Sequence, residues 1–224
     1  MKILKKNNFI ESIANALQYI SYYHSEDFIL AMRRAFEVEK SPVAKDAISQ
    51  VLTNSKLSAF NNRPICQDTG IVTVFVKQGM DLKWDSDKTI EEMVNQGVRN
   101  AYLDKGNPLR ASIVKDPISD RLNTKDNSPA VVHISLVPGD NLDISIAAKG
   151  AGSENKASLG MLNPSDSIVD FILDEIPKMG AGWCPPGVLG VGIGGTAEKA
   201  MLMAKESLFE SINIQEIIQK GPSN

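Results

Sequence analysis

The residues best suited to chemistry lie on two short loops, each of which holds one of the two cysteines in the chain. In the first loop, Cys66, Gln67 and Asp68 place a thiol, an amide and a carboxylate next to one another. A proline and a glycine within residues 63–70 restrict the backbone and permit a tight turn. The apolar run 71–76 follows, with the β-branched and aromatic content of a buried strand. We therefore expect a stiff loop at a strand end, although a buried cysteine before a simple turn would have the same pattern.

The second cysteine lies on a loop of the same design. Cys184 stands within residues 179–187, which are rich in glycine and proline, and the apolar run 188–193 follows. Two cysteines in one chain can form a disulfide, bind a metal or cluster together, or be unrelated thiols. The residues alone leave these three alternatives open.

Other polar features have both a structural and a functional interpretation. Arg110 follows a proline-containing turn, where a lone arginine commonly makes a surface ion pair, but its planar guanidinium also suits two hydrogen bonds to a carboxylate. The glycine-rich residues 149–156 match no phosphate-loop or dinucleotide fingerprint, and instead suit the approach of backbone N–H groups to a small anion. We expect structural roles for His24, between two predicted helices, and for His133, inside a predicted strand.

Five motifs, taken together and in this order, resemble the class I fumarate hydratase and tartrate dehydratase alpha-type family. They are ICQDTG at residues 65–70, NPLR at 107–110, AAKGAGSEN at 147–155, GAGWCPPG at 180–187 and GIGGTAEKA at 192–200. The resemblance covers nearly the whole chain. Members of that family carry a 4Fe-4S cluster on three cysteines, so the resemblance implies that Cys66 and Cys184 are cluster ligands. The third cysteine ligand has no counterpart in this chain.

The resemblance also implies roles for residues around the cysteines. Gln67 and Arg110 would orient the substrate, and Asp68, next to a ligand cysteine, would deliver a proton or order the water. Gly150 and Gly152 would lie near the substrate. Three further residues, Ser153, Glu154 and Asn155, would support them.

The implied reaction is the reversible addition or removal of water on a small dicarboxylate, with the open iron of the cluster as Lewis acid. Fumarate and malate are the first expected substrate pair, and tartrate is the next. The remaining groups would come from a beta-type subunit or a C-terminal domain, in a homodimer or heterotetramer, so we expect the isolated chain to be an inactive part of an iron-sulfur hydro-lyase. The alternatives are a non-catalytic thiol- or metal-binding partner subunit and a redox module.

Composition narrows the class of protein. The 224 residues are enough to bury a sizeable core, and the formal charge of −3 with a pI near 5.5 gives no electrostatic footprint for nucleic acid. The sequence has no apolar run near the ~20 residues of a membrane span, and its basic N-terminus lacks the apolar core of a signal peptide. We expect no membrane partner and a cytoplasmic protein, in which thiols stay reduced.

The elements that must position these loops follow from periodicity. Residues 9–60 predict three amphipathic helices, the third with Val43, Ala47, Val51 and Leu52 on its inner face. Residues 90–103, 165–176 and 197–208 also predict helices, and residues 130–137 and 142–148 predict a hairpin. We expect a mixed α/β fold, with an all-helical N-terminal part (residues 1–60) packed on a mixed β-sheet with flanking helices (residues 61–224).

Overall fold

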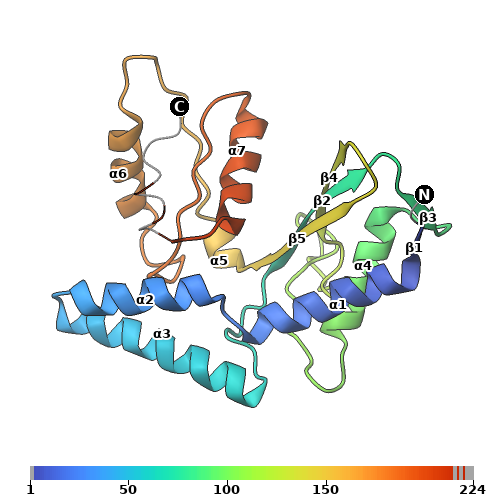
Figure 1. The fold of residues 1–224 in the computed structure, drawn as a ribbon. Helices are drawn as coiled ribbons and strands as arrows, with labels where there is room; N and C mark the ends of the chain where they lie inside the picture. Colours follow the sequence, from blue (N-terminus) through green and yellow to red (C-terminus); the bar gives the residue numbers. More distant parts are fainter. Residues whose placement is uncertain (1–2, 214–215, 217–218, 220–224) are drawn as a thin grey trace. The chain divides into compact units, whose positions relative to one another are not determined.

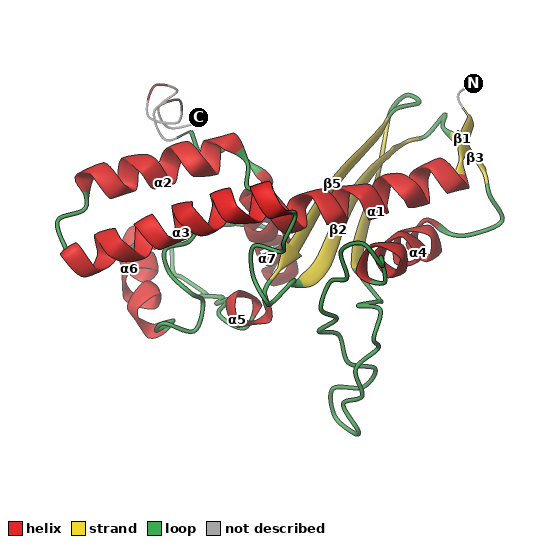
Figure 2. Cartoon of the chain, turned by 90° about the horizontal axis from the view of Figure 1, so that it is seen from below, coloured by secondary structure: helices red, strands yellow, loops and turns green. Residues whose placement is uncertain are grey.

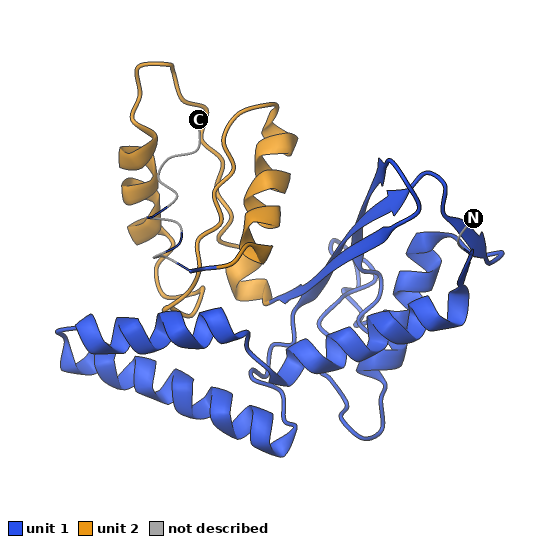
Figure 3. Ribbon diagram, viewed as in Figure 1, with its two compact units in different colours: residues 1–149, 212–224 blue, residues 150–211 orange. Residues whose placement is uncertain are grey.

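The computed structural model of the chain describes residues 3–213, 216 and 219 (Figure 1). It confirms a mixed α/β fold, with a three-stranded sheet and a two-stranded parallel sheet. The described residues form two compact units, one of residues 3–149 with 212, 213, 216 and 219, and one of residues 150–211 (Figure 3). The predicted division at residue 60 stays a prediction. Over the described ranges, no helix has the length and apolar content to cross a membrane.

The first unit is built around strand β2 (Ile71–Gly79), which lies in the middle of the three-stranded sheet. Strand β4 (Val131–Val137) pairs with it in parallel, and strand β5 (Leu142–Lys149) pairs with it antiparallel on the other side. Residues 72–76 are all buried, as a central strand with both faces covered requires. The predicted hairpin is therefore wrong, because β2 separates its two strands.

Helices α1 (Lys6–Tyr22) and α4 (Ile90–Tyr102) lie side by side against one face of this sheet (Figures 1 and 2). Their apolar residues, among them Ile13, Leu17, Met93 and Val98, form one core with the side chains of Val72, Val74 and Val76. A capping box between Thr89 and Glu92 begins α4. The short strands β1 (Ile3–Lys5) and β3 (Lys83–Asp85) pair at the start of α1.

Helices α2 (Glu26–Val38) and α3 (Pro42–Asn61) pack on each other after α1. Ser41 caps α3, with its side chain accepting from the N–H of Ala44, and Pro42 is the first residue of the helix. The predicted inner face of α3 is wrong in its first half, because Val43 is 81% exposed and Ala47 is also exposed. Val51 and Leu52 are half-buried, and the buried residues of the helix are Ile48, Ser55 and Ser58. The buried Ser55 has a polar partner, since its hydroxyl lies 3.0 Å from the Nδ1 of His24.

The second unit contains the short helix α5 (Ala151–Glu154), helix α6 (Ile168–Lys178), helix α7 (Ala197–Glu206) and the 3₁₀ turn η1 (Ser207–Phe209). The apolar run 188–193 is an extended coil in this unit. A side chain on Gly190 or Gly192 would overlap backbone atoms of α7, at Ala204 and Ala200. These glycines therefore allow the run to pack closely on the helix.

Candidate functional site

The loop before β2 holds its own thiol and carboxylate in place. The backbone N–H of Asp68 donates to the Sγ of Cys66 at 3.4 Å, and the N–H of Gly70 donates to the Oδ1 of Asp68 at 3.1 Å. Cys66 and Gln67 are exposed, and Asp68 is half-buried. Gly70 has a φ of +84°, and a Cβ there would lie 2.6 Å from the backbone carbon of Ala148 on β5. The loop is thus fixed at the strand end, as the sequence predicts.

Two buried side chains, neither of which was predicted from the sequence, are hydrogen-bonded to the backbone of this loop. The Tyr102 hydroxyl donates to the Thr69 carbonyl at 2.7 Å, and the Asn127 Nδ2 donates to the Gly70 carbonyl at 3.0 Å. Burial raises the pKa of Tyr102 to about 12, although its hydrogen bonds to Thr69 and Asn127 oppose the shift. Tyr102 therefore stays a neutral hydrogen-bond donor across the physiological pH range.

Arg110 is brought to the same loop by the backbone that carries it. The Thr69 hydroxyl donates to the Arg110 carbonyl, and the Asn127 Oδ1 accepts from the N–H of Ser112 at 2.7 Å. Leu109 is buried in the core of the unit. The Arg110 side chain is exposed. A thiol, an amide, a carboxylate and a guanidinium therefore come from two backbone segments that are joined by hydrogen bonds.

Gln18 of α1 fixes the start of the Arg110 segment. Its Nε2 donates to the carbonyls of Ala101 and Asn107, at 2.6 and 3.0 Å, and its Oε1 accepts from the Asn107 Nδ2 at 2.9 Å. These bonds tie the NPLR motif to both α1 and α4.

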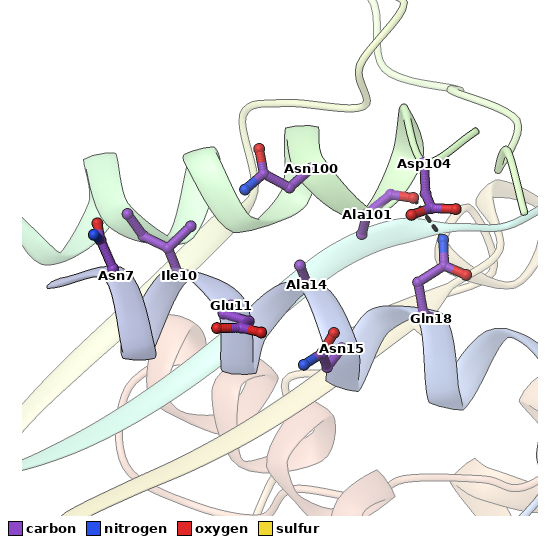
Figure 4. Close-up of a pocket in the computed structure, with 9 residues that line it drawn as sticks. All are labelled: Asn7, Ile10, Glu11, Ala14, Asn15, Gln18, Asn100, Ala101 and Asp104. Atoms are coloured by element: carbon purple, nitrogen blue, oxygen red, sulfur yellow. Dashed lines mark hydrogen bonds between the residues drawn. The ribbon is translucent and has the colours of Figure 1, made fainter. Parts of the chain in front are cut away.

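An open hollow of about 400 Å³ runs along α1 and α4 up to Gln18 (Figure 4). Its lining contains amides, two carboxylates and small apolar side chains: Asn7, Ile10, Glu11, Ala14, Asn15, Gln18, Asn100, Ala101 and Asp104. None of the residues that the sequence singles out for chemistry lines it. We interpret it as a surface groove between two packed helices that belongs to the scaffold.

The second unit holds the other predicted site residues. A Cβ on Gly152 would lie 2.6 Å from the carbonyl oxygen of Gly182, and the Ser153 hydroxyl donates to the carbonyl of Trp183 at 3.3 Å. The Gly150 loop and the Cys184 loop therefore meet, and only a glycine at position 152 allows the approach. Gly150 caps α5.

Cys184 is exposed and has a φ of +59°, a left-handed conformation that is uncommon for a residue other than glycine. Its backbone N–H donates to the Ala181 carbonyl at 3.0 Å. An ion pair between Lys205 and Glu154 joins helices α7 and α5. The loop around Cys184 is thus held by local bonds that leave the thiol free and accessible.

The two cysteines fit an iron–sulfur group in kind, and they are one fewer than the three ligands that the family resemblance implies. Both cysteines are free and exposed, and the Sγ of Cys66 already accepts a backbone N–H, the type of bond that tunes sulfur ligands of such clusters. Within the described part of the chain, no three His, Cys, Asp or Glu side chains are grouped to hold a metal ion. His24 packs on Phe28 and contacts Ser55, and His133 stacks on Phe75, which agrees with structural roles for both histidines.

The sequence of the chain is similar to those of known proteins. The family model described as fumarate hydratase (Fumerase) matches residues 10–220. A protein of Methanocaldococcus jannaschii named putative L(+)-tartrate dehydratase subunit alpha is 36% identical over 197 residues, which cover 85% of this chain and 68% of that protein. Fumarate hydratase 2 of Leishmania major is 32% identical over 197 residues, 85% of this chain and 34% of that enzyme. The L(+)-tartrate dehydratase subunit alpha of Escherichia coli K12 is 26% identical over 211 residues, 92% of this chain and 68% of that subunit.

Proposed function

This chain belongs to the fumarate hydratase (Fumerase) family, and on that premise we propose that it supplies part of the active site of a hydro-lyase. The enzyme would add or remove water on a small dicarboxylate, with fumarate and malate as the first substrate pair and tartrate as the next. One observation supports this proposal most: hydrogen bonds tie the loop of Cys66, Gln67 and Asp68 to the backbone of Arg110. A carboxylate-binding cation and a proton-transfer group therefore lie on joined segments.

Each of these side chains has a specific part in the proposal. Arg110 binds one carboxylate of the substrate through its planar guanidinium, which fixes orientation as well as charge. The Gln67 amide donates to the same substrate. Asp68 accepts or delivers the proton that water addition and removal require. Gly150 and Gly152 bring backbone N–H groups near the substrate.

Cys66 and Cys184 would hold a 4Fe-4S cluster as thiolates, together with a third cysteine from outside these 224 residues. When bound, the cluster supplies a Lewis acid for the substrate oxygen atoms. The N–H of Asp68, which donates to the Cys66 Sγ, would then stabilise the thiolate.

A partner would complete the site. Two of the compared relatives are named alpha subunits, and the chain covers 68% of their length, so we propose a beta-type subunit or a C-terminal domain as the source of the missing groups. The assembly would be a homodimer or heterotetramer in the cytoplasm, where reduced thiols persist. The isolated chain would be inactive.

Two substitutions test the assigned roles in the complex with the complementary polypeptide. Arg110→Lys keeps the charge but loses the planar fork, so kcat/KM should fall about 10–100-fold with the iron content unchanged. Asp68→Asn can keep the bond from the Gly70 N–H and removes proton transfer, so kcat should fall about 10²–10⁴-fold. Arg121→Lys, an exposed arginine of the same unit, is the control and should leave both values unchanged. Normal kinetics in the Arg110 and Asp68 variants would refute the assignment.

A further inference from the structure

The two edge strands of the three-stranded sheet differ in how they are protected. Strand β5 carries Asp143 and Lys149, one near each end, and α1 packs against it. Strand β4, at the other edge, has the sequence VVHISLV and no aspartate, glutamate, lysine, arginine or proline. Its Ile134 is 44% exposed and its Leu136 is 66% exposed. Strand β4 is therefore the edge strand that has no charged residue and that exposes apolar side chains.

An edge strand presents unpaired backbone N–H and C=O groups, which can pair with another strand. Proteins usually prevent such pairing with charged residues, a proline, a bulge or a covering element. Strand β4 pairs with β2 without interruption from Val131 to Val137, so it has no bulge. No described strand lies on its outer side. An edge without a charged residue, a proline or a bulge, and with Ile134 and Leu136 exposed, is expected to be an association surface.

The sequence of β4 indicates what pairs there. Its residues are arranged almost symmetrically about Ile134, with Val132 and Leu136 two positions away, His133 and Ser135 one position away, and Val131 and Val137 at the ends. An antiparallel copy centred on Ile134 would place each residue opposite its symmetric counterpart. Apolar residues would then face apolar residues, and the imidazole of His133 would face the hydroxyl of Ser135.

We propose that β4 pairs antiparallel with β4 of a second copy of this chain, about a twofold axis at Ile134, and joins two three-stranded sheets into one of six strands. Val132, Ile134 and Leu136 lie beside Val74, Val76 and Gln78 of β2, so the new contact continues the sheet face that α1 and α4 cover. Strand pairing of this kind is self-complementary, as a twofold interface requires. No like charges meet across it, because β4 carries no formal charge.

The size of the surface sets the strength of the contact. A seven-residue edge is about 24 Å long, and with a side-chain height of about 10 Å the pairing would bury about 500 Å² in total. Stable interfaces bury about 1,200–2,000 Å². The pairing alone therefore gives a weak dimer that forms at high protein concentration. It is independent of the proposed enzyme activity, because it involves none of the residues assigned to the reaction.

Sedimentation velocity of the chain over a concentration series tests the proposal. The unaltered chain should dimerise reversibly, while Ile134→Lys and Ile134→Glu, which each place like charges opposite one another, should raise the dimer Kd more than about tenfold. An equimolar mixture of the two variants should dimerise again, because lysine then faces glutamate across the axis. Ile118→Lys, at a residue that is 92% exposed and outside the sheet, should dimerise like the unaltered chain.

The mixture makes the test specific for the twofold register. Circular dichroism identifies a variant that does not fold, and in that case Leu136→Lys paired with Val132→Glu replaces it, since these positions face each other across the proposed axis. A chain that stays monomeric at every concentration would overturn the proposal. So would dimerisation unaffected by either charge, or a mixture that stays monomeric, which would indicate that a different strand or polypeptide occupies this edge.

Discussion

Replacement of Asn127 by glycine should destabilise the chain more than the loss of any other side chain that is hydrogen-bonded to the loop around Cys66. Asn127 is fully buried, and its side chain bonds the Gly70 carbonyl and the N–H groups of Ser112 and Ile113, at 3.0, 2.7 and 3.3 Å. Its φ of +60° is left-handed, which glycine adopts without strain, so the substitution removes the side-chain bonds and leaves the backbone conformation allowed.

The magnitude follows from the three groups that lose their partner. A buried polar group left without a hydrogen bond costs about 1–3 kcal/mol, and the Gly70 carbonyl keeps a long contact of 3.5 Å with the Tyr102 hydroxyl. We therefore expect a loss of about 3 kcal/mol in the free energy of unfolding. With an m value of about 2 kcal/mol/M, the midpoint of urea unfolding should fall by about 1.5 M.

Urea unfolding followed by circular dichroism measures this shift. Asn62→Gly is the matched control, because Asn62 also has a left-handed φ, of +48°, but is exposed. It should change the free energy of unfolding by less than about 0.5 kcal/mol. If Asn127→Gly is no more destabilising than Asn62→Gly, the Asn127 side chain does not hold the two backbone segments together and the reasoning is refuted.

Three further outcomes are expected from the same contacts. Tyr102→Phe removes the bond to the Thr69 carbonyl and should lower the free energy of unfolding by about 1–2 kcal/mol in urea unfolding, with Tyr19→Phe, on an exposed ring, as a neutral control. Gly79→Ala would place a methyl group against the Gly139 carbonyl, and thermal unfolding should show a loss of about 2–3 kcal/mol, whereas Gly180→Ala meets no atom within 4 Å and should cost only about 1 kcal/mol, for the left-handed φ of +62° at that position. Burial lowers the pKa of His24, so the unfolded chain binds the proton first as pH falls; stability should be complete above pH ~6.5 and decline as pH falls through the lowered pKa, and His24→Gln should remove that part of the pH dependence of unfolding.

The helices and the first loop could be predicted from the sequence because their signals are local. Apolar spacing indicates both α1 and α4, and a cap at Thr89 begins α4, which the sequence predicts at residues 90–103 and which lies at Ile90–Tyr102. The proline and glycine around Cys66 predicted a fixed loop at a strand end, and the structure shows it. The sequence is enough to predict a structural feature where the residues that interact lie only a few positions apart.

The strand order depended on contacts between distant segments. Alternation in residues 130–137 and 142–148 predicted two strands correctly, but adjacent strands in sequence are not always neighbours in space. The uninterrupted apolar run of β2 was the signal for a strand with both faces buried, hence a central one. Applied first, that signal would have placed β2 between the other two.

The side chains that hold the candidate site, Asn127 and Tyr102, were not predicted, because their partners are also distant in the sequence. Asn127 lies in a polar stretch that has the composition of a surface excursion, yet it is fully buried because its side chain replaces missing backbone partners 14 to 57 residues away. Tyr102 ends α4, and its hydroxyl reaches the Thr69 carbonyl, 33 residues earlier in the sequence. The residue types indicate which groups could react, and their roles stay predictions, whereas the groups that hold them are defined only by the three-dimensional contacts.

The iron and sulfide content of the chain after anaerobic reconstitution, alone and with the complementary polypeptide, tests the central claim most directly. The chain carries Cys66 and Cys184 as the only cysteines in its sequence, so alone it should retain little cluster. The complex should hold a stoichiometric 4Fe-4S cluster that is lost in Cys66→Ser and Cys184→Ser and kept in Arg110→Lys. A stable, stoichiometric cluster on the lone chain, or a complex that keeps its cluster in both serine variants, would contradict the account.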